Sequence, residues 1–301
     1  MAKRIWQFIT SPYMMLAFAI LTWAGNFVLG RSIRVEVTPI SLTFWRWFTA
    51  FLLMLPFYGK YFASHGAAMR RHALWLVVMS VLGVGLFHVF VYQALQTTEA
   101  INASLMLAAT PVVILVIVWV GFGERLLPRQ VLGIFISLGG VASVVTRGDL
   151  SIILELEFTP GDLWMLGAVP LWALYSVMLR HRPSELPPFA FLVAITGIGS
   201  VLLGAAYAWE ASQGRGMVFS TGNLISVLYL GVFASFLAYI FWNEGIARIG
   251  ASKGGQFMHL MPVFSTILAV IFLGEQVHLY HVAGIALIFA GIYLNSSTKN
   301  A

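Results

Sequence analysis

The chain has no cysteine, and few of its residues are charged: 17 Lys and Arg and 11 Asp and Glu among 301. The absence of cysteine excludes disulfides, thiolate nucleophiles and cysteine-ligated metal sites. In a typical water-soluble domain about a quarter of the residues are charged. Here the charged fraction is 9%, whereas 60% of the residues are hydrophobic. The composition therefore predicts a protein that lies in a lipid bilayer.

Signatures of catalysis are also scarce. The sequence contains no His-Glu-x-x-His, and its two aspartates, Asp149 and Asp162, lie outside the apolar runs or at the edge of one, so they form no intramembrane pair. We expect no metal and no cofactor, and an intramembrane enzyme is the less favoured alternative. A channel is disfavoured as well, because no ring of like charge is visible in the sequence.

Ten apolar runs, bounded by charged residues, Pro or Gly, follow one another along the chain. A helix needs ~20 residues to cross a bilayer, so 301 residues accommodate about ten such helices with short loops. The first run is too long for a signal peptide and has no small-residue cleavage site after it, so we expect it to be retained. The runs lie near 12–31, 39–58, 73–96, 100–121, 129–146, 162–180, 187–209, 222–244, 250–273 and 278–295. They predict an all-α membrane protein with ten transmembrane helices.

The basic residues are divided unevenly between the two sides of the predicted bundle. One side holds Arg31, Arg34, Arg147 and Arg215; the other holds Lys3, Arg4, Lys60, Arg70, Arg71, Arg125, Arg129, Arg180, Arg182, Arg248, Lys253 and Lys299. Cytoplasmic loops carry the excess of Lys and Arg, so both termini are predicted to be cytoplasmic. This topology accounts for the net charge of +6. The basic residues form no continuous face for a phosphate backbone, and we expect no nucleic acid partner.

The sequence contains an internal duplication. Residues 110–124 read TPVVILVIVWVGFGE, and 151 positions later residues 261–275 read MPVFSTILAVIFLGE. In the first helix of each half, TWAGNFVLGR (22–31) aligns with LWALYSVMLR (171–180). A unit of five helices is odd in number, so its second copy enters the bilayer from the opposite side. We therefore predict two inverted five-helix repeats, residues 1–147 and 162–301, joined by an external linker at 148–161.

Several of these features together resemble the drug/metabolite transporter superfamily, in its EamA-type branch. The likeness rests on the duplicated five-helix unit, on WAGN (23–26), on the arginine within FWRWFTA (44–50), and on the paired Pro and Gly-Glu positions, and it covers nearly the whole chain. Within that branch the sequence looks most like aromatic amino acid exporters of bacterial inner membranes. The resemblance implies a multi-pass inner-membrane transporter that works by alternating access, as a monomer or weak homodimer.

We expect residues from both halves to line a central cavity for a small-molecule substrate. Pairs three or four positions apart share one helical face, and polar residues inside a span need a partner or water. The predicted substrate-binding residues are Trp23, Asn26, Arg46, His88, Tyr92, Trp172, Tyr175, Tyr239, Asn243, Gln256 and His259. The alternative for the Trp-Asn pair is helix packing, and for His88 a bond to a neighbouring carbonyl. Arg46 could bind a substrate carboxylate or clamp backbone carbonyls.

Two paired motifs are predicted to act as hinges or gates. Pro111 and Pro262 each free a carbonyl one turn earlier and can kink their helices toward a cavity, although a kink that serves packing alone is the alternative. Glu124 and Glu275 end their spans on opposite sides of the bilayer, and the alternative for them is a solvated helix terminus. Separately, glycines seven positions apart in the fifth and tenth spans predict close helix packing.

These features favour a secondary transporter that exports small neutral metabolites. Aromatic side chains and few fixed charges suit aromatic or other hydrophobic amino acids better than sugar phosphates, which would require several basic groups. The alternative is an exporter of other small metabolites or drugs, of a multidrug or nucleoside type. The acidic residues all lie in loops or near the ends of spans, so the usual intramembrane carboxylate of a proton relay is missing.

Overall fold

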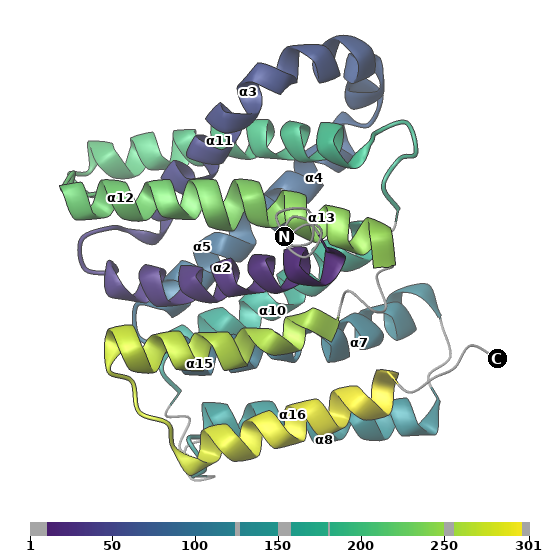
Figure 1. Ribbon diagram of the computed structural model, residues 1–301, viewed down its shortest axis with the longest axis vertical. Coiled ribbons are helices and arrows are strands. Elements are labelled where there is room, and N and C mark those ends of the chain that lie inside the picture. The colour runs from purple at the N-terminus through teal and green to yellow at the C-terminus, as the bar shows by residue number, and fades with distance from the viewer. Residues whose placement is uncertain (1–10, 124–126, 150–157, 180, 250–255, 297–301) are drawn as a thin grey trace, which may run out of the picture.

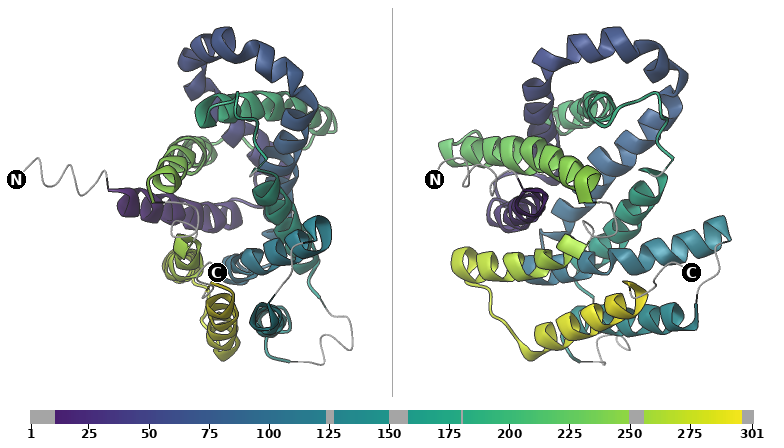
Figure 2. Two further views of the ribbon diagram at one scale, coloured as in Figure 1. Left: turned by 90° about the vertical axis from the view of Figure 1, so that its right-hand side faces the viewer. Right: turned by 45° about the vertical axis from the view of Figure 1, so that its right-hand side comes forward.

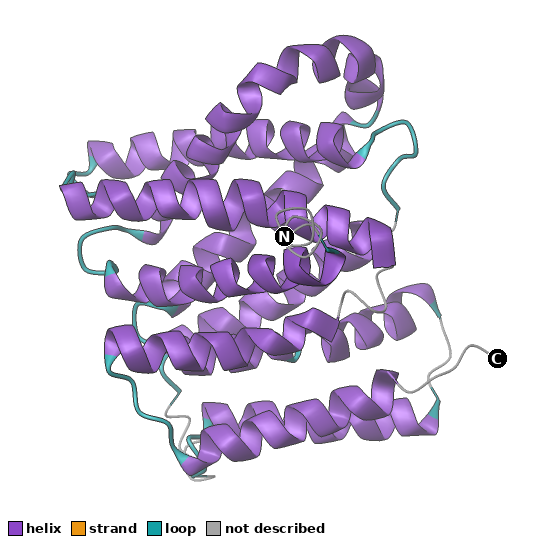
Figure 3. Cartoon of the chain, viewed as in Figure 1, coloured by secondary structure: helices purple, strands orange, loops and turns teal. Residues whose placement is uncertain are grey.

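Helices that run side by side form the bundle shown in Figure 1, and loops join them at its two ends. The structure is a computed structural model that describes residues 11–123, 127–149, 158–179, 181–249 and 256–296. Among these residues the backbone is helical or looped, as Figure 3 shows, apart from one isolated antiparallel bridge between Val37 and Met217. An all-α fold is therefore confirmed for the described part of the chain.

The helices of the first half follow the predicted runs closely. They are α2 (Pro12–Ser32), α3 (Pro39–Arg71), α4 (Ala73–Ser80), the π-helix η1 (Val81–Leu86), α5 (Phe87–Ala94), α6 (Ala100–Ala108), α7 (Thr110–Phe122) and α8 (Pro128–Val145). The largest difference is α3, which was expected to end near residue 58 and continues to Arg71. Pro56 lies inside this helix and removes one N–H from its ladder. The far end of α3 curves over to reach α4 (Figure 2).

The second half repeats this order of segments. Its helices are α10 (Pro160–Leu179), α11 (Pro188–Ser212), α12 (Thr221–Tyr229), the π-helix η2 (Leu230–Leu237), α13 (Ala238–Ile249), the 3-10 helix η3 (Gln256–His259), α15 (Leu260–Leu273) and α16 (Leu279–Ser296). Each half thus has a π-helix inside its third predicted span. A π-helix shifts the backbone hydrogen bonds by one residue, and such shifts are frequent at functional sites.

In the described part of the chain, seven helical segments are long and apolar enough to cross a membrane: Pro12–Ser32, Pro39–Phe57, Ala73–Ala94, Ala100–Gly121, Pro160–Leu179, Pro188–Ser212 and Thr221–Trp242. Three shorter helices are apolar too, at Pro128–Val144, Leu260–Leu273 and Leu279–Gly291. The chain is accordingly a multi-pass membrane protein. The count of ten crossing helices and the inverted relation of the two halves stay predictions.

Helix α2 lies at the centre of the bundle, where it packs against α13, α15 and η2 of the second half. Helix α10 packs in turn against α5 and α7 of the first half. Each half therefore buries its first helix against the other half, and the space between them holds residues from both. At this centre, helices that are far apart in the sequence lie next to one another, and the predicted cavity residues meet there.

Helices α8 and α16 form a separate pair at the lower edge of the bundle in Figure 1. A Cβ atom added to Gly140 would lie 2.9 Å from the carbonyl oxygen of Gly284 and 2.8 Å from Ile288. Only glycine permits this separation, so the prediction that the spaced glycines serve close helix packing is confirmed.

Candidate substrate cavity

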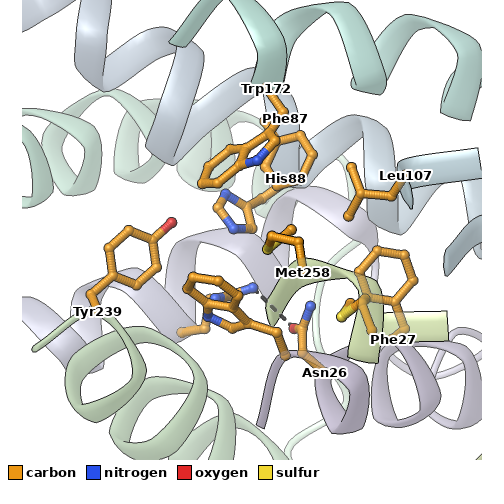
Figure 4. Close-up of a pocket in the computed structure, with 11 residues that line it drawn as sticks. Asn26, Phe27, Phe87, His88, Leu107, Trp172, Tyr239 and Met258 are labelled. Carbon is orange, nitrogen blue, oxygen red and sulfur yellow. Dashed lines mark hydrogen bonds between the residues drawn. The ribbon is translucent and has the colours of Figure 1, made fainter. Parts of the chain in front are cut away.

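A small cavity of about 30 Å³ lies between the two halves. That volume holds about one water molecule, so a metabolite can enter only if the surrounding helices separate. Figure 4 shows the side chains around it. The cavity is lined by Trp23, Asn26, Phe27, Arg46, Phe87, His88, Leu107, Trp172, Tyr239, Met258 and Met261.

Arg46 is the only charged side chain among these lining residues, and it is 1% exposed. Its Nη1 donates to Asn26 Oδ1 at 2.9 Å and to the hydroxyl of Tyr92 at 2.7 Å. Its Nε donates to Ser235 Oγ at 2.9 Å. The hydroxyl of Tyr92 also donates to Asn26 Oδ1. These bonds hold the guanidinium in one orientation and join helices α2, α3, α5 and η2.

The π-helix η2 contributes a backbone acceptor to this network. The carbonyl oxygen of Ala234 accepts from Trp23 Nε1 at 2.9 Å and from Arg46 Nη2 at a long 3.5 Å. Backbone carbonyls in hydrocarbon must be satisfied within the protein. Here an indole and a guanidinium from the first half bond a carbonyl of the second half. The irregular backbone of η2 thereby helps to hold Trp23 and Arg46 in their positions at the cavity.

Aromatic rings form most of the wall. The ring of Trp23 lies 5.6 Å from that of Tyr239 in an edge-to-face arrangement. On the opposite wall, Phe87 and Trp172 have ring centroids 4.8 Å apart, and Trp172 stacks on Tyr175 at 5.2 Å. Ring pairs at these separations pack favourably. The cavity therefore offers flat apolar surfaces with one fixed cation.

His88 lies on the same wall, on α5, as Figure 4 shows. Its Nδ1 accepts a long hydrogen bond of 3.4 Å from the indole N–H of Trp47, and the two rings meet edge to face. An acceptor role for Nδ1 places the proton of a neutral imidazole on Nε2. His88 thus lines the cavity and also contacts a neighbouring helix.

The predicted substrate-binding residues fall into three groups. Six of them line the cavity: Trp23, Asn26, Arg46, His88, Trp172 and Tyr239. Tyr92 and Tyr175 are buried directly behind the lining, where they hold Arg46 and Trp172. Asn243 lies on α13, and Gln256 and His259 lie on η3, but their side chains are outside the described residues. Whether any of these residues binds substrate stays a prediction.

Comparison with known proteins identifies the family. The sequence pattern of the EamA-like transporter family matches residues 10–146 and, a second time, residues 159–297. The chain belongs to this family. It is thus a transporter of the drug/metabolite transporter superfamily.

Relatives of this EamA-like transporter carry transporter names. The Bacillus subtilis protein "Uncharacterized transporter YyaM" is 27% identical over 279 residues, which cover 93% of this chain and 91% of that protein. An Archaeoglobus fulgidus protein, "Uncharacterized transporter", is 27% identical over 298 residues and covers 97% and 99%. A crystal structure at 21% identity matches with a TM-score of 0.60 over 94% of this chain and 96% of that one, which shows the fold alone. None of these names states a substrate.

The predicted hinge of this EamA-like transporter at Pro111 lies at a break in the fourth span. Helix α6 ends at Ala108, and α7 begins at Thr110, with Pro111 in its first turn. The carbonyl of Leu107, one turn before the proline, accepts from the hydroxyl of Thr110 at 2.6 Å. The freed carbonyl is therefore satisfied locally, although Leu107 itself lines the cavity. Pro262 lies in the first turn of α15, directly after the 3-10 turn η3.

In each of the two Gly-Glu pairs, the glycine ends a helix. Gly123 and Gly274 end α7 and α15 with φ of 67° and 68°, the left-handed conformation that glycine adopts without strain. Glu124 lies outside the described residues. Glu275 accepts from the backbone N–H of Ala100 at 2.8 Å and of Ile101 at 3.1 Å, so it caps α6. Burial raises the pKa of Glu275, while these two hydrogen bonds oppose that shift.

Several lining residues were not predicted: Phe27, Phe87, Leu107, Met258 and Met261. Sequence reasoning missed them because an apolar residue in an apolar run carries no signal of which way it faces. Ser235 was missed too, although a lone hydroxyl inside an apolar run is a usable sign of a buried polar contact. Among the described residues, no cluster of three His, Asp or Glu side chains could hold a metal ion.

Proposed function

We propose that this transporter exports small neutral metabolites, with aromatic or other hydrophobic amino acids as its substrates, by alternating access through the central cavity. The observation that carries the proposal is the cavity itself, which lies between the halves and is walled by rings from both. The rings of Trp23 and Trp172 come from the first helix of each half. An aromatic or aliphatic side chain would lose water on entering and pack against these rings.

Alternating access requires that the cavity open to one side at a time. In the described conformation the cavity measures only about 30 Å³, which holds about one water molecule. Movement of the second half against the first would widen it, because α2, α13 and α15 meet there. The predicted inverted relation of the halves would let the same motion open either side.

Reconstitution of the purified chain in liposomes tests the proposal. We expect saturable uptake of phenylalanine that is accelerated by unlabelled phenylalanine inside the vesicles, because a carrier exchanges substrate faster than it returns empty. A phosphorylated sugar should be neither taken up nor able to compete, since one arginine cannot neutralise a phosphate dianion. Uptake of the sugar phosphate without uptake of phenylalanine would contradict the proposal.

Trp172→Ala provides a matched test of the aromatic wall. We expect weaker phenylalanine transport from the loss of ring contacts, of order tenfold in affinity. Trp119→Ala is the control, because Trp119 is 52% exposed on α7 and does not line the cavity. If both substitutions weakened phenylalanine transport equally, the aromatic wall of the cavity would not be the substrate-binding site.

A further inference from the structure

Arg46 is a buried cation for which the described residues supply no anion. The ion pairs Arg71–Glu185 and Arg248–Glu244 are both partly exposed and do not involve Arg46. Acidic residues outside the described ranges, at positions 124, 155 and 157, lie between predicted spans in the sequence. An arginine within a membrane span is costly unless a partner or water compensates its charge.

The hydrogen bonds of Arg46 go to neutral groups and leave one nitrogen poorly satisfied. Both N–H groups of Nη1 are used, by Asn26 and Tyr92, and the single N–H of Nε is used by Ser235. Nη2 has two N–H groups, and its one contact is the 3.5 Å approach to Ala234, whose oxygen already accepts from Trp23. A distance of 3.5 Å exceeds the usual range for N–H···O bonds. Nη2 therefore retains donor capacity next to the cavity.

We propose that a carboxylate of the transported molecule binds Arg46 through Nη2, so that the substrates of this transporter are organic carboxylates, which include amino acids because these are neutral overall yet carry a carboxylate. The inference rests on the proposed function in taking this cavity as the transport site. A single guanidinium matches the single charge of a carboxylate, and the hydrogen bond gains strength because both groups are ionised. The aromatic walls would then accept the rest of the molecule.

The surrounding contacts fix the guanidinium before a substrate arrives. Asn26, Tyr92 and Ser235 hold Nη1 and Nε from three different helical segments. A group that is already oriented loses little conformational entropy on binding. The cation thus has a fixed place at the edge of a cavity whose volume must change during transport.

Binding measurements on matched pairs of ligands test the inference. The probes are 3-phenylpropionate and phenylalanine, each compared with its own carboxamide, and 4-methylpentanoate with its amide. Acid and amide have nearly the same size and shape but differ in charge at one end. With the purified full chain in nanodiscs, we expect each acid to bind about tenfold or more tightly than its amide. Equal affinities for acid and amide, or no binding by any of the acids, would overturn the inference.

Two variants locate the preference at Arg46. In Arg46→Gln the ratio of acid affinity to amide affinity should fall to near one. Arg46→Lys keeps the charge without the planar fork, so part of the preference should remain. If the Gln variant fails to fold, the acid-to-amide ratio of the unmodified chain and of the Lys variant still decides the matter. An undiminished ratio in either folded variant contradicts the assignment.

Counterflow in liposomes separates this inference from the proposed function. Saturable exchange of amides or nucleosides, with no binding or exchange of carboxylates, would retain a transporter and overturn the carboxylate site. Carboxylate binding that depends on Arg46, without any exchange, would support the site and contradict transport of these molecules.

Discussion

The carboxylate of Glu275 bonds the first backbone amides of a helix from the other half, with Oε1 2.8 Å from the N atom of Ala100. Oε2 lies 3.1 Å from the N atom of Ile101. The first N–H groups of a helix have no partner within it, and they carry the positive end of its dipole. Glu275 therefore ties the loop between α15 and α16 to the start of α6. This contact joins the two halves at one end of the bundle.

Loss of this cap should destabilise the protein. We expect Glu275→Ala to lower the free energy of unfolding by about 1 kcal/mol, the usual cost of removing a helix cap. The measurement is the thermal melting temperature of the purified chain. Glu185→Ala is the control, because Glu185 forms an exposed ion pair with Arg71 that should contribute only a few tenths of a kcal/mol. A control that melts as low as Glu275→Ala would contradict the capping role.

The stability contributed by Glu275 should depend on pH. Burial, the largest effect, raises its pKa above the ordinary carboxyl value, so the folded chain binds this proton more tightly than the unfolded chain does. Stability from this group is therefore fully present below the unfolded pKa and declines as pH rises through the folded pKa. Relative to Glu275→Gln, the unmodified chain should lose melting temperature from acidic to neutral pH. A relative gain would show that the amide hydrogen bonds dominate instead.

Two adjacent glycines of α8 should differ in their response to the same substitution. Gly140→Val would drive its side chain into Ile288 and the carbonyl of Gly284, and we expect a loss of about 1–3 kcal/mol. A Cβ added at Gly139 has no neighbouring atom within 4 Å, so the melting temperature of Gly139→Val should be close to that of the unmodified chain. Melting curves of the two variants make the comparison. Similar losses would mean that α8 and α16 are not packed as the structure shows.

An internal carboxylate should compete with a substrate carboxylate at Arg46. Asn26 Oδ1 already accepts from Nη1, so Asn26→Asp places a negative charge next to the guanidinium without a change of shape. We expect an equal or higher melting temperature and about tenfold weaker binding of 3-phenylpropionate, with little change for its amide. Ser235→Ala is the matched control, since it removes a neutral acceptor and should affect acid and amide alike. Unchanged acid binding in Asn26→Asp would contradict the expected competition.

The distribution of Lys and Arg predicts that both termini face the cytoplasm. A reporter enzyme that is active only outside the cytoplasm should stay inactive when fused after Ala301. The same reporter fused in the predicted external linker, at residue 150, should be active. Active fusions at both positions would mean that the number of crossing helices is odd, and activity at Ala301 alone would mean that the orientation is reversed.

Much of the fold follows from local properties of the sequence. A segment in hydrocarbon must satisfy its own backbone, so an apolar run of sufficient length becomes a helix whatever its neighbours are. The runs near 12–31 and 187–209 accordingly match α2 and α11 to within a few residues. The glycine spacing that predicted close helix packing is equally local, because residues seven apart share one face.

The sequence by itself thus determined the bilayer environment, the helices and the likeness to EamA-type transporters. Only the tertiary structure decided that Tyr92 supports Arg46 from behind the cavity, and that Glu275 caps a helix 175 positions earlier. The tertiary structure also placed the carbonyl of Ala234, in the π-helix η2, next to Arg46. The physical reason is that helical periodicity fixes which side chains share a face. Which neighbour that face meets depends on contacts between segments far apart in the chain.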